Sequence, residues 1–181
     1  MHRRNLLEQL SSYLQRHPEE KATTTRFIEF VEAHPRCFER DCWAGHVTGS
    51  AWLVDASRSR LLLTHHKKLN MWLQLGGHSD GDADTRQVAL REAREESGLG
   101  VKLLQADIFD VDIHEIPARK NDPAHFHFDV RYAICAAEDQ FVVSDESMAL
   151  AWVEIRQLEQ YTVETSILRM RDKWLQQNQL F

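Results

Sequence analysis

Cysteine is scarce in this sequence, and its scarcity limits the classes of protein that the chain can belong to. The 181 residues include three cysteines, Cys37, Cys42 and Cys135, with no dense spacing pattern. A small, odd number argues against a disulfide framework and predicts reduced thiols, as is usual in the cytosol. Cys37 and Cys42 are separated by four residues, but no second pair completes a zinc site. We therefore interpret all three as ordinary side chains.

Long apolar runs and basic blocks are also missing. No apolar run approaches the 18 residues of a membrane helix, and the N-terminal MHRRNLLEQL has no signal-peptide core. The net charge of −6, without a block of lysine or arginine, argues against nonspecific binding to nucleic acid or anionic membranes. A small nucleotide ligand is still compatible with this net charge, because a metal ion can neutralise the negative charge of the nucleotide. We expect a cytoplasmic protein without a membrane partner, and nucleic acid is a disfavoured partner.

The size and composition of the chain fit one globular domain with a small extension. Apolar residues make up 43% and charged residues 28%, both ordinary for a soluble protein. Helical spacing of apolar residues predicts two helices, at residues 5–16 and 18–33, with Pro18 in the first turn of the second. We assign residues 1–42 to an N-terminal helical extension and 43–181 to the main domain. The two helices of the extension could cover an open edge of the sheet, form a dimer or cap the substrate pocket. A purely structural packing role is favoured over a functional one.

The main domain combines strands and helices. Apolar runs and alternation predict strands at residues 46–55, 61–63, 101–114 and 125–135, with a bulge in the third. A polar loop is expected at 65–70, and a loop or hairpin tip at 115–124, where prolines and charges cluster. Residues 148–153 precede a predicted C-terminal helix at 155–177.

One stretch, GGHSDGDADTRQVALREAREESGL at residues 76–99, carries the chemistry. A glycine pair and an Asp/Gly-rich loop lead into a helix predicted at 85–97. Asp84 is a suitable N-cap, with Gln87 three residues on as its capping-box partner. Gly98 suits the left-handed position that follows a helix.

Three glutamates share one face of this helix. Glu92, Glu95 and Glu96 are spaced i, i+3 and i+4, so their like charges repel and cost stability. A divalent cation converts that repulsion into coordination, since Mg²⁺ and Mn²⁺ prefer carboxylate oxygens. The alternative interpretation is an acidic helix face that is merely solvated. The glycine loop directly upstream disfavours this alternative.

The stretch resembles the box of the Nudix (MutT-like) hydrolase family, in which a glycine is followed by a glutamate and then by R-E-U-x-E-E-x-G-U. Gly77 matches the first glycine, and Arg91 to Leu99 match the second half. Ala83 stands where the family has its first glutamate, which puts the bracing of the loop and a secondary metal contact in doubt. Asp82 and Asp84 are candidate substitutes. The resemblance implies an α/β (α+β) fold, an α/β/α sandwich with a central mixed sheet.

The resemblance also implies an activity: metal-dependent hydrolysis of the diphosphate bond in a nucleoside diphosphate linked to another group. It implies Mg²⁺ or Mn²⁺ held by the three glutamates, a small-molecule nucleotide substrate and, as a fair expectation, a homodimer. Which carboxylate acts as general base stays open. The remaining catalytic and substrate-binding candidates are Arg91, which orients a glutamate, Glu146 in a later acidic loop, and Gly76, Gly77 and His78.

The segment HFHFDVRYAIC alternates apolar and polar residues, as a strand with two different faces does. Its polar face carries His125, His127 and Arg131, which either contact phosphate, metal or substrate, or belong to a solvated face with an Asp–Arg pair. The sequence favours neither. Aromatic rings are available to stack on a base, although a core role is favoured for them: Trp72, Phe126, Phe128 and His66.

Two alternative functions remain. One is an enzyme similar to isopentenyl-diphosphate isomerase, whose metal is held by histidines and glutamates, but the cysteine-centred signature of that enzyme is not evident. The other is a catalytically inactive Nudix module that senses a ligand. Ala83 favours this second alternative, whereas the retention of all three glutamates disfavours it.

Overall fold

The computed structural model describes residues 2–119, 122–145 and 147–178. The chain forms two compact units, each assembled from separate segments. The first unit comprises Met1–Ser50, Gly76–Ala89 and Ala106–Tyr132, and the second comprises Ala51–Leu75, Leu90–Gln105 and Ala133–Phe181. Three elements, β1 (His46–Val54), α3 (Thr85–Ser97) and β7 (His125–Ala136), run from one unit into the other. The domain boundary expected between residues 42 and 43 stays a prediction.

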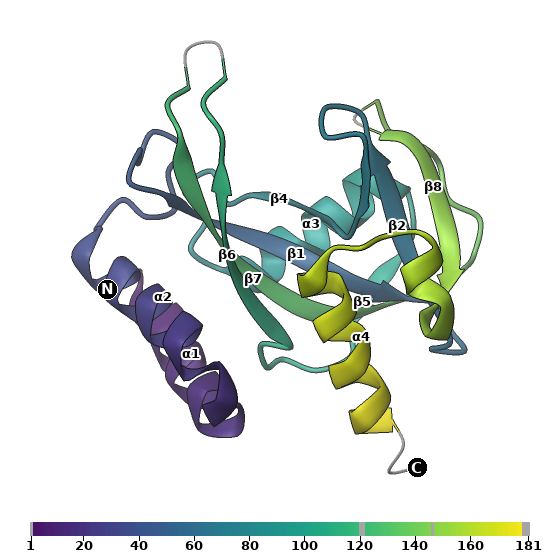
Figure 1. Cartoon of the computed structure of the whole chain (residues 1–181), viewed down its shortest axis with the longest axis horizontal. Helices are drawn as coiled ribbons and strands as arrows, with labels where there is room; N and C mark the ends of the chain where they lie inside the picture. Colours follow the sequence, from purple (N-terminus) through teal and green to yellow (C-terminus); the bar gives the residue numbers. More distant parts are fainter. Residues whose placement is uncertain (1, 120–121, 146, 179–181) are drawn as a thin grey trace. The chain divides into compact units, whose positions relative to one another are not determined.

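The first unit begins with the two predicted helices. They are α1 (Arg4–Arg16) and α2 (Lys21–Ala33), and they lie side by side (Figure 1). A single 3₁₀ turn, Pro18–Glu20, precedes α2, since the fixed φ of proline suits a helix start. Leu6, Leu10 and Tyr13 are fully buried on α1, which confirms its apolar face.

β6 (Asp110–Ile116) and the first part of β7 form a long hairpin in the first unit. β6 pairs antiparallel with β7, from Asp110 opposite Arg131 to Ile116 opposite His125. The hairpin tip expected at 115–124 is confirmed in its described part, where Arg119 and Asp122 form an isolated bridge. The single strand predicted over 101–114 is wrong. It is divided into β5 (Val101–Leu103) and β6, which pair with β7 on either side of an irregular segment.

α2 packs directly on β7. The ring of Phe30 stacks on that of Phe128 with a centroid distance of 3.7 Å, and Phe27 meets the same ring edge-on at 5.3 Å. All three side chains are at most 7% exposed. Packing against the sheet, the favoured role of the extension, is therefore observed for α2.

This contact gives the first prediction. Replacing Phe30 with leucine should lower the free energy of unfolding by about 1–2 kcal/mol, because the aromatic pair is lost while most of the apolar volume is kept. Thermal or denaturant unfolding measures the change. Glu29→Ala, on an exposed position of the same helix, is the control and should stay within about 0.5 kcal/mol of the parent protein. Equal stabilities for the two variants would contradict a packing role for α2.

The second unit contains β2 (Arg60–His66), β3 (Met71–Leu73) and β8 (Ser147–Glu154). β2 pairs antiparallel with both neighbours and with the end of β1 through Val54 and Leu61. His65 and His66, predicted to lie in a loop, belong to β2 because β3 and β8 supply partners on both sides.

The C-terminal helix predicted over 155–177 is interrupted. A 3₁₀ segment, Ile155–Gln160, comes first and α4 (Thr165–Asn178) follows. Thr162 separates them: its N–H donates to the carbonyl of Leu158 (3.0 Å), and its hydroxyl accepts from the N–H of Glu164 (3.2 Å). Such local side-chain bonds compete with the helical pattern.

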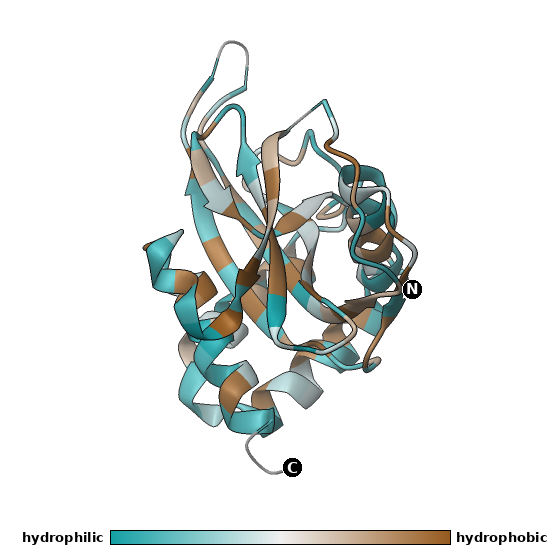
Figure 2. Cartoon of the chain, turned by 90° about the vertical axis from the view of Figure 1, so that its right-hand side faces the viewer, coloured by the Kyte–Doolittle hydropathy of each residue, from teal (hydrophilic) through white to brown (hydrophobic). Residues whose placement is uncertain are grey.

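Strand pairing in the described chain joins eight strands in one mixed sheet. The order is β3-β2-β1-β7-β5, with β4 (Leu75–His78) beside β1, β6 beside β7 and β8 beside β2. Hydrophobic and hydrophilic bands alternate along the strands (Figure 2). With its flanking helices, the sheet confirms the α/β (α+β) fold class expected from the sequence.

Candidate active site

The glycine pair lies in a strand and not in a loop. Gly76, Gly77 and His78 belong to β4, beside β1. A Cβ atom added to Gly76 would lie 2.8 Å from the Cα of Ser50, which is too close for any side chain. Glycine at this position therefore lets two backbones approach closely.

The loop after β4 is held by the end of the N-terminal segment. Asp80 and Gly81 adopt positive φ angles of 50° and 87° and turn the chain. The N–H of Gly81 donates to the carbonyl of Phe38 (2.9 Å), and the guanidinium of Arg40 binds the carboxylate of Asp80, with Nη2 2.7 Å from Oδ2. The loop is thus ordered by residues from outside the Gly76–Leu99 stretch.

The hydrogen bonds at the start of α3 confirm Asp84 as the N-cap, but they do not confirm Gln87 as its capping-box partner. Oδ1 of Asp84 accepts a hydrogen bond from the N–H of Arg86 (3.2 Å), as an N-cap should. The N–H of Asp84 donates to Oδ1 of Asp82 (2.9 Å), the role that the capping-box prediction assigned to Gln87. An Asx turn two residues upstream reaches this N–H more directly. Two aspartates therefore brace the segment around Ala83.

The three glutamates lie where the helical spacing placed them, on α3. Glu96 is 8% exposed and the side chain of Glu92 is 17% exposed, whereas Glu95 is exposed. Hard carboxylate oxygens on one helix face are a suitable donor set for Mg²⁺ or Mn²⁺. The residues present therefore fit the divalent ion that the sequence implies.

The flanks of the acidic face are also as expected. Nη2 of Arg91 donates to Oε1 of Glu92 at 2.9 Å, a contact that suits an orienting role. Gly98 has a φ of 70°, and its N–H donates to the carbonyl of Arg94 (2.7 Å), so the predicted left-handed end of the helix is confirmed. The catalytic role of Arg91 stays a prediction.

Five histidines gather in the first unit, and sequence reasoning singled out only three of them as site residues. His78, His125 and His127 were expected to contact substrate, a role that stays a prediction. His46 at the start of β1 and His114 on β6 join them. Ring centroids lie 4.7 Å apart for His46 and His127, 5.0 Å for His78 and His127, and 5.4 Å for His114 and His127.

The electrostatics of this cluster are set by burial. Burial lowers the pKa of His46 to about 4, with further lowering by His78 and His125. Burial also lowers the pKa of His127 to about 2, with His78 and His46 as the next causes. Both imidazoles are therefore neutral at pH 7, so neither brings the positive charge that favours a phosphate contact.

Arg131 is buried among carboxylates of its own unit. Its Nε donates to Asp129 (2.7 Å), its Nη1 to Asp110 (3.2 Å), and its Nη2 lies 3.4 Å from Asp112. Burial alone would lower the pKa of this guanidinium, but the three aspartates hold it above its ordinary value. The Asp–Arg pair expected from the sequence is present, but the solvated face is wrong, since Asp129 and Arg131 are each 2% exposed.

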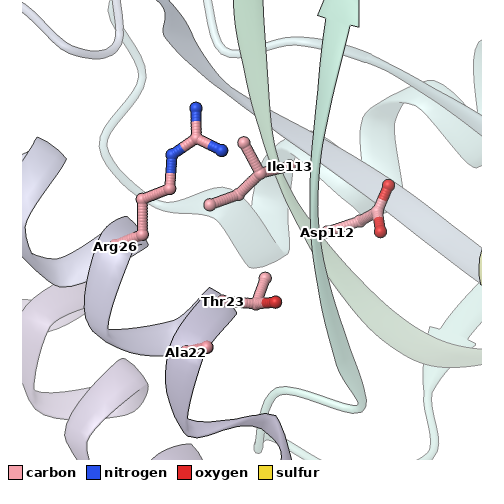
Figure 3. A pocket seen from close by; sticks show the side chains of 5 residues that line it. All are labelled: Ala22, Thr23, Arg26, Asp112 and Ile113. Atoms are coloured by element: carbon pink, nitrogen blue, oxygen red, sulfur yellow. The ribbon is translucent and has the colours of Figure 1, made fainter.

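A pocket lies between α2 and β6, and its Asp112 contacts His114 of the histidine cluster. It is lined by Ala22, Thr23, Arg26, Asp112 and Ile113, and the carboxylate of Asp112 points away from Arg26 (Figure 3). The guanidinium of Arg26 lies 4.5 Å from the ring centre of Phe126, and Asp112 faces Arg131. The charged groups of this pocket are therefore engaged elsewhere.

Comparison with known proteins identifies the family. The NUDIX domain model matches residues 45–173, which is most of the chain. The chain belongs to the NUDIX family. The Nudix hydrolase family expected from the sequence is thereby confirmed. No curated protein sequence matches the chain.

Solved structures share the Nudix fold with this chain at low identity. A NUDIX-family hydrolase from Clostridium perfringens is 24% identical with a TM-score of 0.54, over 71% of this chain and 95% of its own. The MutT protein of Methanosarcina mazei Go1 is 17% identical with a TM-score of 0.59, over 74% and 95%. A C. elegans Ap4A hydrolase is 16% identical with a TM-score of 0.54, over 75% and 98%. At these identities the likeness establishes the fold.

One catalytic candidate and two of the candidates for stacking on a base remain to be placed. Glu146 lies outside the described residues. Phe128 is a core residue beneath Phe30, as favoured, while Trp72 is half-buried with its ring 5.0 Å from that of His65. Among the helices of the described residues, none combines the length and apolar character needed to cross a membrane.

Proposed function

We propose that this Nudix protein is a Mg²⁺- or Mn²⁺-dependent hydrolase that cleaves the diphosphate bond of a nucleoside diphosphate linked to another group. The acidic face of α3, with Glu92, Glu95 and Glu96 following the Nudix glycines in sequence, supports this proposal most directly. Like charges at these spacings repel one another, and a bound cation would offset that repulsion. A nucleotide substrate and a homodimer belong to the same proposal.

The residues would act in distinct roles. Glu92, Glu95 and Glu96 would hold the ion, and Arg91 would keep Glu92 in position through their 2.9 Å contact. When bound, the ion supplies charge neutralisation at the diphosphate oxygens and lowers the pKa of water. One of these carboxylates, or Glu146, would take the proton from the water that attacks phosphorus, and the phosphorylated leaving group would depart.

An alanine at position 83 is compatible with an active enzyme. The loop that the missing glutamate would brace is held by Asp82, Asp84 and the Arg40–Asp80 pair. These contacts support an ordered loop without a glutamate at this position. A ligand-sensing module is therefore the less favoured function.

A substrate screen tests the proposal. Full-length protein is incubated with nucleotide sugars, dinucleotides, damaged nucleotides and capped RNA, each with Mg²⁺ or Mn²⁺, and phosphate products are measured. We expect hydrolysis of at least one class that stops on chelation and returns with Mg²⁺ or Mn²⁺. Binding of a nucleotide without turnover under every metal condition would instead favour the inactive module.

A further inference from the structure

Three imidazoles of the first unit are placed so that one ion can bind them all. His46 begins β1, His125 begins β7, and His127 follows on the same side of β7. One ring nitrogen from each lies within 4.8 Å of the other two. A tetrahedral zinc ion with Zn–N bonds of about 2.0–2.1 Å holds its ligand atoms about 3.4 Å apart. Small side-chain rotations would therefore bring the three ring nitrogens to the spacing that one zinc ion requires.

Two of these rings have buried nitrogens without a hydrogen-bond partner. His46 is 2% exposed, and of its two buried ring nitrogens the backbone of Cys42 reaches one at most within the described residues. The Nε2 atom of His127 is likewise buried and unpartnered within the described residues. A buried polar atom without a partner destabilises the folded protein, and a bound ion would satisfy its lone pair.

The third ring is oriented as a ligand would be. Nδ1 of His125 lies 2.8 Å from the carbonyl oxygen of Pro123 and therefore carries the hydrogen. The lone pair of the neutral ring is then on Nε2. Metal-binding histidines commonly donate their other nitrogen to a backbone carbonyl or a carboxylate in this way. The same pattern occurs at the border of the cluster, where Nδ1 of His114 lies 3.2 Å from Oδ2 of Asp112.

We propose that His46, His125 and His127 bind one divalent transition-metal ion of the zinc class, with a fourth position for water or a ligand. Imidazole nitrogens suit Zn²⁺, Co²⁺ and Ni²⁺, whereas Mg²⁺ prefers the oxygen ligands of the α3 carboxylates. Three protein ligands with an open position are typical of catalytic zinc sites. This site and the proposed hydrolysis rest on different residues, so either can fail without the other.

Metal titration of the metal-free, full-length protein tests the site. Zn²⁺ affinity is measured by competition with a chromophoric chelator, and Co²⁺ binding is followed by visible absorption. We expect one tight Zn²⁺ equivalent and the intense bands of four-coordinate Co²⁺. His127→Ala should weaken Zn²⁺ binding by roughly 100-fold or more, since removal of an outer-shell partner alone costs about 10- to 100-fold.

Two controls identify the ligands. His34→Ala removes a half-buried histidine of the same unit outside the cluster, and should leave Zn²⁺ affinity within about threefold of the parent protein by the ordinary additivity of distant sites. A Glu95→Gln, Glu96→Gln double variant should keep the Co²⁺ bands. Loss of those bands in the double variant with their retention in His127→Ala would overturn the proposal.

A measurement on the unaltered protein covers the case in which His127→Ala fails to fold. X-ray absorption of the zinc-loaded protein should show imidazole nitrogen neighbours. A spectrum with oxygen neighbours only, or no tight Zn²⁺ binding at all, would exclude the three-histidine site.

Discussion

Replacing Glu95 or Glu96 with glutamine should lower the turnover number of metal-dependent diphosphate hydrolysis by about 100- to 1,000-fold. Glutamine keeps the shape of the side chain but removes the charge that holds the ion. The loss is expected because a bound metal supplies several kcal/mol of transition-state stabilisation, and each 1.36 kcal/mol corresponds to a factor of ten in rate. Initial rates with the best substrate of the screen, measured over a Mg²⁺ titration, give the effect.

Stability measurements separate this catalytic effect from unfolding. Without metal, Glu95→Gln removes one of several like charges at an exposed position, so it should leave the protein as stable or raise stability by about 0.2–0.5 kcal/mol per pair. Glu138→Gln, at an exposed position of the same unit, is the matched control and should keep full activity. Full activity in either Glu95→Gln or Glu96→Gln would show that the ion is held elsewhere.

Replacing Arg131 with methionine should lower the free energy of unfolding by about 3–5 kcal/mol. The guanidinium faces Asp110, Asp112 and Asp129 and is itself 2% exposed. Removing one partner of a buried ion pair leaves uncompensated charge in a poorly hydrated site, which is strongly destabilising. At about 2–4 °C per kcal/mol for a chain of this size, the melting temperature should fall by about 10 °C.

A second arginine of the chain supplies the control. Arg171 also contacts two carboxylates, those of Glu159 and Asp172, but their side chains are 57% and 58% exposed. Arg171→Met should cost at most about 1 kcal/mol, because exposed ion pairs contribute little. If Arg131→Met were no less stable than Arg171→Met, the buried network would not be the reason for a guanidinium at position 131.

Local features of the site were predictable from the sequence because each depends on neighbours along the chain. The helix from Thr85 to Ser97, its cap at Asp84 and its end at Gly98 were all expected. Spacing along a helix determines which side chains share a face, so the glutamates could be grouped without knowledge of the fold. The capping-box partner was wrong because Asp82 competes for the same N–H group.

The polar face of β7 shows where the sequence alone was insufficient. Alternation predicted which residues share a face, but not what covers that face. The structure brings Asp110 and Asp112 from β6 to Arg131, and His46 from β1 to His125 and His127. The pattern Asp110-Val111-Asp112 on a strand is the one local signal for the aspartates. His46, a lone histidine at a strand start, carries no comparable signal.

The stretch from Gly76 to Leu99 determined by itself the family, the helix and the acidic face, because a turn and a helix are built from contacts a few residues apart. Tertiary structure decided the rest: which loop contacts replace the glutamate missing at position 83, which charges surround Arg131, and which imidazoles meet. Those outcomes depend on strand pairing between segments far apart in the chain. Side chains on adjacent strands become neighbours only when the sheet forms, and no local spacing rule encodes that partnership.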